Sequence, residues 1–211
     1  MAFFDDYLSY GYYPYYMENE IDYYSVINSV MGYVIDDELP RICGVDLENT
    51  RKIRALMNIL AAGEPYEVDI SRMSVQSGLQ RKTILTYLKY LSDAKLVNLL
   101  YSDYINVKKM QKPDKIYIEN TNMLKALATH PIKEGTLRET FAINHLAFTH
   151  SVEYGKQKGD FVVDGKFTIE VGGQGKTTKQ IANVPNAYIL ADDIEFPIGN
   201  KLPLWILGFL Y

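Results

Sequence analysis

The sequence predicts a mixed α+β / α/β fold in three parts: a helical N-terminal segment, a winged helix-turn-helix, and a C-terminal domain with the element order αβββαβ. Three observations predict it: apolar residues at helical spacing from residue 53 onward, a helix-turn-helix pattern centred on Gly78, and a hairpin signal at Asp164-Gly165. The corresponding domains are residues 1–48, 49–120 and 121–211.

The N-terminal segment is acidic and rich in tyrosine. The first fifty residues carry ten Asp or Glu and a single base, Arg41, together with nine of the chain's 18 Tyr. The run from Tyr10 to Tyr16 is too aromatic for a free linker, so we expect it to pack against the rest of the chain. Between residues 21 and 39 the apolar residues have helical spacing, which predicts a helix that needs a partner surface.

Residues 49–120 have the pattern of a winged helix. The first helix is predicted by apolar residues at i, i+3, i+4 and i+7, namely Ile53, Leu56, Met57 and Leu60. A second and a third helix flank Gly78, which can adopt the left-handed conformation that a tight interhelical turn needs. Apolar stretches at residues 99–101 and 115–118, on either side of a polar loop, predict the two strands of the wing.

Charge patterning in this segment favours a polyanion as partner. Residues 79–115 carry eight Lys or Arg against three Asp, a local charge of +5, whereas the whole chain has a net charge of −4. Such local stripes supply phosphate contacts in DNA-binding proteins. The candidate nucleic-acid-binding residues are Arg81, Lys82, Thr86, Lys89, Lys108, Lys109 and Lys112. The alternative is a solvated helix in a winged helix that binds protein.

A tight β-hairpin is predicted at Asp164-Gly165, because this dipeptide accepts the positive φ angles of a type I′ turn. The flanking residues 161–163 and 167–171 are rich in β-branched and aromatic side chains. Side chains alternate along each strand, so Asp160 and Glu170 are expected to converge at one edge of the sheet. Paired carboxylates suit Mg²⁺, which can polarise a phosphodiester. These two acids are the candidate metal ligands, and no cofactor other than Mg²⁺ is predicted.

A second interpretation of the same stretch is a phosphate-binding P-loop at residues 172–178. The pattern needs a Gly five residues before Gly175, where the chain has Glu170. It also needs more strands after the loop than the remaining 33 residues could supply (211 minus 178). We therefore reject the P-loop and predict that the chain does not bind ATP.

The spacing of the two acids resembles the D…(D/E)xK signature of the PD-(D/E)xK nuclease superfamily. Asp160 is followed, after nine residues, by Glu170-Val171-Gly172. This resemblance implies a restriction-endonuclease-like αβββαβ core. The predicted elements are a helix at residues 136–150, a strand at 151–154, the hairpin, a helix from about 177, and a strand at 187–191.

The chain departs from that signature where Gly172 replaces a lysine that would stabilise charge in the transition state. Lys176 could supply the missing cation, supported by Gln180 one helical turn further on; the alternative is that Lys176 is an exposed loop cation. Many members of the superfamily carry a third acid on the first helix, which the resemblance places at Glu139. The competing interpretation is that Glu139 closes a capping box that begins at Thr136. We predict that this site is degenerate.

Nearly the whole chain resembles the C-terminal region of bacterial and archaeal AAA-type ATPases, in which a winged helix and a PD-(D/E)xK-like domain of unknown function follow the ATPase domain. The stretches that carry the resemblance are residues 8–14, 112–122, 137–141 and 169–173. The chain has no Walker A, Walker B or sensor residues. We expect it to be the tail of a larger protein or the product of a truncated gene.

Composition limits the size of the core, the disulfides and the membrane segments that the chain can have. With 47% hydrophobic and 23% charged residues, the chain can bury two small cores. The single cysteine, Cys43, excludes an internal disulfide and suits a reducing cytoplasm. The longest apolar run, residues 202–211, is about half of the roughly 20 residues that span a membrane, so no membrane partner is expected. The chain has three histidines, His130, His145 and His150. We expect one of them to pack in the interior and two to lie at the surface.

Three functional hypotheses remain. The first is an accessory module of an AAA-type ATPase that binds DNA or a partner protein through its winged helix and carries a nuclease-like domain without catalysis. The second is an active Mg²⁺-dependent endonuclease that cleaves duplex or branched DNA with Asp160, Glu170 and Lys176. The third is a platform that regulates the ATPase or forms oligomers through protein contacts.

Overall fold

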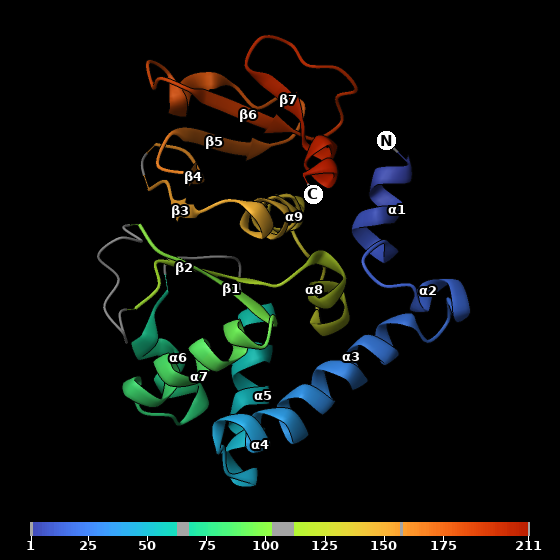
Figure 1. The fold of residues 1–211 in the computed structure, drawn as a ribbon, viewed down its shortest axis with the longest axis vertical. Coiled ribbons are helices and arrows are strands. Elements are labelled where there is room, and N and C mark those ends of the chain that lie inside the picture. The colour runs from blue at the N-terminus through green and yellow to red at the C-terminus, as the bar shows by residue number, and fades with distance from the viewer. Residues whose placement is uncertain (1, 63–67, 103–111, 157, 211) are drawn as a thin grey trace.

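The computed structural model describes residues 2–62, 68–102, 112–156 and 158–210 and has a mixed α and β fold (Figure 1). An N-terminal helical region is followed by a two-stranded sheet and then by a five-stranded sheet. Helices α3 to α7 lie at one end of the molecule and the five-stranded sheet lies at the other, with α8 and α9 between them. No helix in these ranges is long and apolar enough to cross a membrane.

The N-terminal segment is a succession of short helices. They are α1 (Ala2–Tyr10), α2 (Tyr15–Glu18), α3 (Tyr23–Tyr33), the π-helix η1 (Val34–Glu38) and α4 (Leu39–Cys43). Tyr23, Ile27 and Met31, spaced one helical turn apart, are buried on α3. The helix predicted between residues 21 and 39 is therefore confirmed, although its last turns widen into a π-helix.

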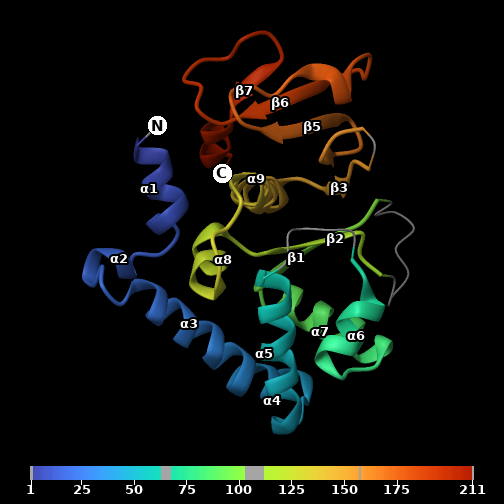
Figure 2. The same ribbon diagram turned by 180° about the vertical axis from the view of Figure 1, so that it is seen from behind.

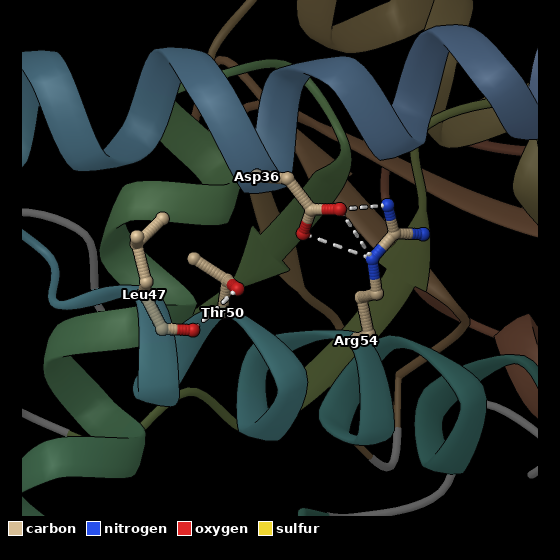
Figure 3. Close-up of polar contacts among 4 residues, drawn as sticks. All are labelled: Asp36, Leu47, Thr50 and Arg54. Atoms are coloured by element: carbon tan, nitrogen blue, oxygen red, sulfur yellow. Dashed lines mark hydrogen bonds and ion pairs between the residues drawn. The ribbon is translucent and has the colours of Figure 1, made fainter.

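An ion pair ties the π-helix to the next long helix, α5 (Leu47–Ala62), as Figure 3 shows. Arg54 Nε donates to the two carboxylate oxygens of Asp36, at 3.0 and 3.1 Å, and Arg54 Nη2 pairs with the same carboxylate. A Cβ at Gly32 would lie 2.7 Å from Arg54 Nη2, so the guanidinium would have to shift if position 32 carried a side chain. The pair joins the N-terminal helices to the segment that follows.

The next helices and strands follow the order predicted for residues 49–120. After α5 come α6 (Ile70–Ser77), α7 (Arg81–Asp93), β1 (Val97–Leu100) and β2 (Lys115–Ile118). The Asp69 carboxylate caps α6 by accepting from backbone N–H groups of its first turn. Gly78, with φ at +67°, ends α6 in the left-handed conformation and lets the chain turn into α7. Strands β1 and β2 pair antiparallel, with Val97 opposite Ile118.

A first hydrophobic core joins these elements to the N-terminal helices. It contains apolar residues from α3, α5, α6, α7, both strands and α8 (Thr121–Leu127). Ile53 and Leu56, two of the residues that predicted the first helix, are fully buried in it. Helix α8 contributes Met123 and Leu124 and packs against α3 and α5, so this core extends past residue 120.

The second half of the molecule is built on helix α9 (Glu134–Thr149) and the five-stranded sheet, in the order β3-β4-β5-β6-β7. The strands are β3 (Val152–Tyr154), β4 (Phe161–Val163), β5 (Phe167–Gly172), β6 (Ala187–Ala191) and β7 (Lys201–Pro203). Strand β4 is antiparallel to β3 and to β5, whereas β6 is parallel to β5 and to β7. Helix α9 packs against β5 and lies between the sheet and α8 (Figure 2).

The predicted hairpin between β4 and β5 is confirmed. Asp164 and Gly165 both have positive φ, at +53° and +62°. Lys166 N donates to the Val163 carbonyl at 3.0 Å across the turn. Two consecutive residues with positive φ are the mark of a type I′ turn, whose twist matches that of the flanking strands.

The helix predicted from about residue 177 is wrong. The chain there forms a single 3₁₀ turn, η2 (Thr178–Ile181). Asn183 and Asn186 both have positive φ and Pro185 lies between them, so the chain leaves helical geometry directly after η2. Strand β7 and the C-terminal 3₁₀ helix η3 (Leu204–Phe209), which packs on α9, were not predicted from the sequence.

The N-terminal helix α1 contacts both halves of the molecule, the first half being α2 to α8 with β1 and β2, and the second being α9 with the five-stranded sheet. Phe4 and Leu8 are buried in a second core with residues of α9 and the sheet. The Leu8 carbonyl accepts hydrogen bonds from Thr121 Oγ1 at 2.6 Å and from Asn122 Nδ2 at 2.9 Å, both on α8. The tyrosine-rich run that follows α1 packs partly on the first core, which confirms that it is not a free linker.

Candidate acidic site and basic helix

The hairpin brings Asp160 and Glu170 to neighbouring strands. In the register of β4 and β5, Phe161 is opposite Ile169, so the next positions outward are Asp160 and Glu170. Asp160 Oδ2 accepts a hydrogen bond from Val171 N at 2.8 Å, and Glu170 is almost completely buried. Burial raises the pKa of Glu170 above its ordinary value, and the negative charge of Asp160 adds to the rise.

Lys176 lies against Gly172 and contacts Glu170. A Cβ at Gly172 would lie 2.8 Å from both Cγ and Cδ of Lys176 and 2.9 Å from its Cβ. Lys176 Nζ is 2.5 Å from Glu170 Oε1, and this contact partly offsets the effect of burial on the pKa of Glu170. The lysine side chain therefore fills the space that a side chain at position 172 would occupy. It is paired with an acid and is not a free loop cation.

Glu139 belongs to the same cluster. Helix α9 begins at Glu134 without a side-chain cap, so Glu139 lies inside the helix and the capping-box interpretation is wrong. Its Oε2 accepts hydrogen bonds from Tyr117 Oη at 2.7 Å and from Lys115 Nζ at 3.3 Å. Burial raises the pKa of Glu139, and the nearby Asp160 carboxylate raises it further.

Sequence reasoning missed two residues of this cluster, Lys115 and Tyr117. They stand two positions apart on β2, which places both on one face of the strand, and this alternation is the signal that could have found them. Tyr117 is 2% exposed, and burial beside Glu139 raises the pKa of its phenol well above the ordinary value, so the hydroxyl remains a donor. Lys115 Nζ lies 5.1 Å from the centre of the Tyr154 ring, a cation–π contact.

Gln180 is not part of the cluster. It is exposed on η2, and no hydrogen bond joins it to the acids in the part of the chain that the structure describes. Because the predicted helix is absent there, Gln180 does not lie one α-helical turn beyond Lys176.

Arg138, which was not predicted as a site residue, stabilises the loop that carries Lys176. Its Nε donates to Asp192 Oδ2 at 2.9 Å, and Asp192 N donates to the Gly172 carbonyl at 2.8 Å.

The donors of this cluster fit a magnesium ion. Glu170 Oε2 is buried without a hydrogen-bond partner among the described residues, so one carboxylate oxygen is left for a ligand. Mg²⁺ is commonly held by one or two carboxylates and keeps several waters. Within the described ranges, there is no group of three or more His, Cys, Asp or Glu side chains that could hold a metal ion. The residues that would hold an ion here are therefore the two carboxylates Asp160 and Glu170.

The candidate basic surface lies at the start of α7. Arg81 and Lys82 are exposed, and neither side chain has a hydrogen bond or ion pair to another residue that the structure describes. The opposite face of the helix is fully buried through Ile84, Leu88 and Leu91. The helix thus presents its basic end to solvent while its apolar face anchors it in the first core.

The other predicted nucleic-acid-binding residues are less available for contact with a phosphate. Lys89 is exposed but paired with an acid on the same helix. Thr86 Oγ1 donates to the backbone carbonyl four residues earlier, at 3.1 Å. Lys112 is partly buried just before β2. Lys108 and Lys109 lie outside the described residues.

The three histidines have the structural roles expected of them. His145 is buried on α9, where burial lowers its pKa to about 4, and its Nε2 lies 3.2 Å from Tyr12 Oη. His150 Nδ1 is 2.8 Å from an oxygen of Asp164 at the hairpin turn, and His130 is exposed. One histidine therefore packs inside the molecule and two lie at its surface.

Comparison with known proteins gives one match. The model of a family described as Domain of unknown function (DUF8612) matches residues 1–133, more than half of the chain. The matched part includes α1 to α8 and therefore Tyr117 and the basic start of α7, whereas Asp160, Glu170 and Lys176 lie beyond it. No curated protein and no solved structure matches the chain.

Proposed function

The chain belongs to the DUF8612 family, and we propose that it is a DNA-binding accessory module of an AAA-type ATPase. In this proposal, residues 49–120 form a winged helix-turn-helix and residues 121–211 form a restriction-endonuclease-like domain. The succession of three helices and an antiparallel strand pair supports the first assignment. The mixed sheet with α9 packed on it supports the second. The ATPase as partner rests on the sequence resemblance alone.

The unpaired basic start of α7 carries the proposal. Arg81 and Lys82 follow the turn at Gly78, and the N-terminal residues of the corresponding helix contact DNA in helix-turn-helix proteins. Because both side chains are exposed and have no partner in the described ranges, they break no ion pair when they meet a phosphate. The positive end of the α7 dipole adds to the attraction for an anion.

Fluorescence anisotropy with a labelled DNA duplex tests this proposal. Removing both cations in Arg81→Ala/Lys82→Ala should weaken binding about tenfold or more at low salt, because phosphate contacts are lost. The matched control is Arg51→Ala/Lys52→Ala, which removes the same two residue types from α5. Equal weakening in the two variants, or no binding by the native chain, would contradict the proposal and favour a platform for protein contacts.

A second candidate function, a Mg²⁺-dependent DNA endonuclease, is favoured by the position of Lys176. Bound Mg²⁺ would polarise the scissile phosphodiester and acidify a water molecule. Asp160 and Glu170 would hold the ion through their carboxylate oxygens. Lys176, whose side chain lies over Gly172, brings its ammonium beside Glu170, as a lysine at position 172 would. A cation there can stabilise negative charge that develops on the phosphate.

Incubation of plasmid and branched DNA with Mg²⁺ or Mn²⁺ tests the second candidate. Cleavage by the native chain that disappears in Asp160→Ala, Glu170→Ala and Lys176→Ala would establish an endonuclease with a displaced lysine. If the native chain cuts neither substrate, the domain is an inactive accessory, as in the first proposal. Cleavage that survives Asp160→Ala would point to a contaminating nuclease.

A further inference from the structure

We propose that Tyr117 and Lys115, on strand β2, are positioning residues of the acidic site: they hold the Glu139 carboxylate toward Asp160. The site is then a joint product of both halves of the molecule, because β2 belongs to the first half and the acids belong to the second. This inference rests on the proposed metal-dependent site at Asp160 and Glu170.

The geometry of the two contacts carries the inference. Tyr117 Oη donates to Glu139 Oε2 at 2.7 Å, and Lys115 Nζ lies 3.3 Å from the same oxygen. The Lys115 and Glu139 side chains are only 13% and 21% exposed, so water competes little with these bonds. Since both donors bind Oε2, neither of them occupies Oε1.

Repulsion between the carboxylates explains why Glu139 needs the bonds from Tyr117 and Lys115. Asp160 is opposite Glu170 in the register of β4 and β5, and the next residue, Phe161, has its ring 6.0 Å from the ring of Tyr117, so the three acids gather in one region of the molecule. Like charges repel, and a glutamate on a helix can rotate its carboxylate away from such a neighbour. The two donors on β2 oppose that rotation. The cluster thus holds two acid–lysine pairs, Glu139 with Lys115 and Glu170 with Lys176.

Strand β2 is itself docked on the sheet beside the acids. The Tyr117 ring lies 6.0 Å from the ring of Phe161, the residue that follows Asp160 on β4. Lys115 Nζ lies over the ring of Tyr154 on β3. A purely structural role, in which these residues only fasten the halves together, would change stability without changing the affinity of the acids for a cation. Metal affinity therefore separates the two roles.

Isothermal titration of the full chain with Mn²⁺ tests the inference. Tyr117→Phe removes one hydroxyl and no charge, and it should weaken Mn²⁺ binding about tenfold or more, the usual cost of losing a bond to a group around a metal site. The matched control, Tyr24→Phe, removes a hydroxyl that donates to the Ser9 carbonyl between two N-terminal helices, and it should leave the affinity unchanged. Thermal unfolding of each variant checks that it is folded during the titration.

A double-mutant cycle shows whether Tyr117 acts through Glu139. In a Glu139→Gln background, Tyr117→Phe should cause no further loss of Mn²⁺ affinity, because the carboxylate that it positions is already gone. Losses that add, or unchanged affinity in Tyr117→Phe alone, would overturn the inference and leave the metal site standing. No Mn²⁺ binding by the native chain, or binding that survives Asp160→Ala, would overturn the metal site itself and the inference with it.

Discussion

The start of α7 and the acidic site hold their charges in opposite ways. At α7, two neighbouring cations stand in water without a partner in the described part of the chain. At the acidic site, Glu170 is buried and Glu139 is largely shielded from water, and they are paired with Lys176 and Lys115 respectively. Exposed charges cost little to keep and are free to meet a ligand, whereas buried charges lose their hydration and need partners.

Because of this difference, substitutions in the two regions should affect different properties: ligand affinity at α7 and folding stability at the acidic site. Substitutions at the start of α7 are expected to change the affinity for a polyanion and to leave the unfolding free energy almost unchanged. Substitutions within the acidic site are expected to change stability first, because each side chain there compensates the charge of another. The experiments below test this contrast in order of expected effect.

Lys176→Met should cause the largest loss of stability. It leaves the Glu170 carboxylate buried without its cation, which we expect to lower the unfolding free energy by about 3 kcal/mol near neutral pH. The pKa of Glu170 is raised by burial, so the folded protein takes up a proton there as the pH falls. The loss should therefore shrink in mild acid and grow as the pH rises through the folded-state pKa. Urea unfolding at about pH 8 and about pH 5 measures both.

The double variant Lys176→Met/Glu170→Gln serves as the control for that experiment. It removes the buried charge together with its partner, so most of the lost stability should return at the higher pH. A loss that is equal at both pH values, or that persists in the double variant, would show that Lys176 stabilises the fold by packing and not by pairing with Glu170.

Gly172→Lys should have the next largest effect. Its Cβ would meet the Lys176 side chain at 2.8–2.9 Å, an overpacked contact that we expect to cost about 1–3 kcal/mol of unfolding free energy. The swapped variant Gly172→Lys/Lys176→Gly vacates that space and should regain most of the stability. Chemical denaturation of the three proteins decides the matter. A single variant as stable as the native chain would mean that Lys176 does not occupy this space.

His145 gives a smaller, pH-dependent effect. Its pKa is lowered to about 4 by burial, whereas an unfolded histidine titrates at about 6.5. Between these values the unfolded chain binds the proton and the folded chain does not, so the native protein should lose stability as the pH falls through this window. In His145→Gln that part of the pH dependence should be absent. Identical pH profiles of the two proteins would contradict this assignment.

ATP should have no effect at all. Lys176 is already paired with Glu170, and the loop after β5 leads into a 3₁₀ turn rather than the helix that a phosphate-binding loop needs. A ligand present at about 100 times its Kd would add about 2.7 kcal/mol of stability. Thermal unfolding with and without Mg-ATP should therefore give the same Tm. A rise that vanishes in Lys176→Ala would revive the phosphate-loop interpretation.

The parts of the fold that could be predicted from the sequence depend on local signals. The turn at Asp164 and Gly165 follows from two residues that accept positive φ, and the turn fixes the register that places Asp160 beside Glu170. The turn between α6 and α7 is similarly local, because Gly78 ends one helix shortly before the next begins.

The parts that could not be predicted depend on contacts between distant segments. The bond from Tyr117 to Glu139 joins two residues that are 22 positions apart in the sequence, and only the packing of β2 against the second half of the molecule brings them together. The position of Lys176 over Gly172 depends on the path of a loop, which Arg138 braces from α9 through Asp192. Periodicity and spacing carry no information about such contacts.

The central claim, that the start of α7 is a phosphate-binding surface, is tested most directly by the salt dependence of duplex-DNA affinity. For the native chain, the logarithm of the affinity should fall linearly with the logarithm of salt concentration. In Arg81→Ala/Lys82→Ala the slope should be smaller by up to about 1.8, since each neutralised phosphate contributes about 0.9. The unfolding free energy of this variant should stay within about 0.5 kcal/mol of the native value. Salt-insensitive binding, or a native slope in the variant, would contradict the claim.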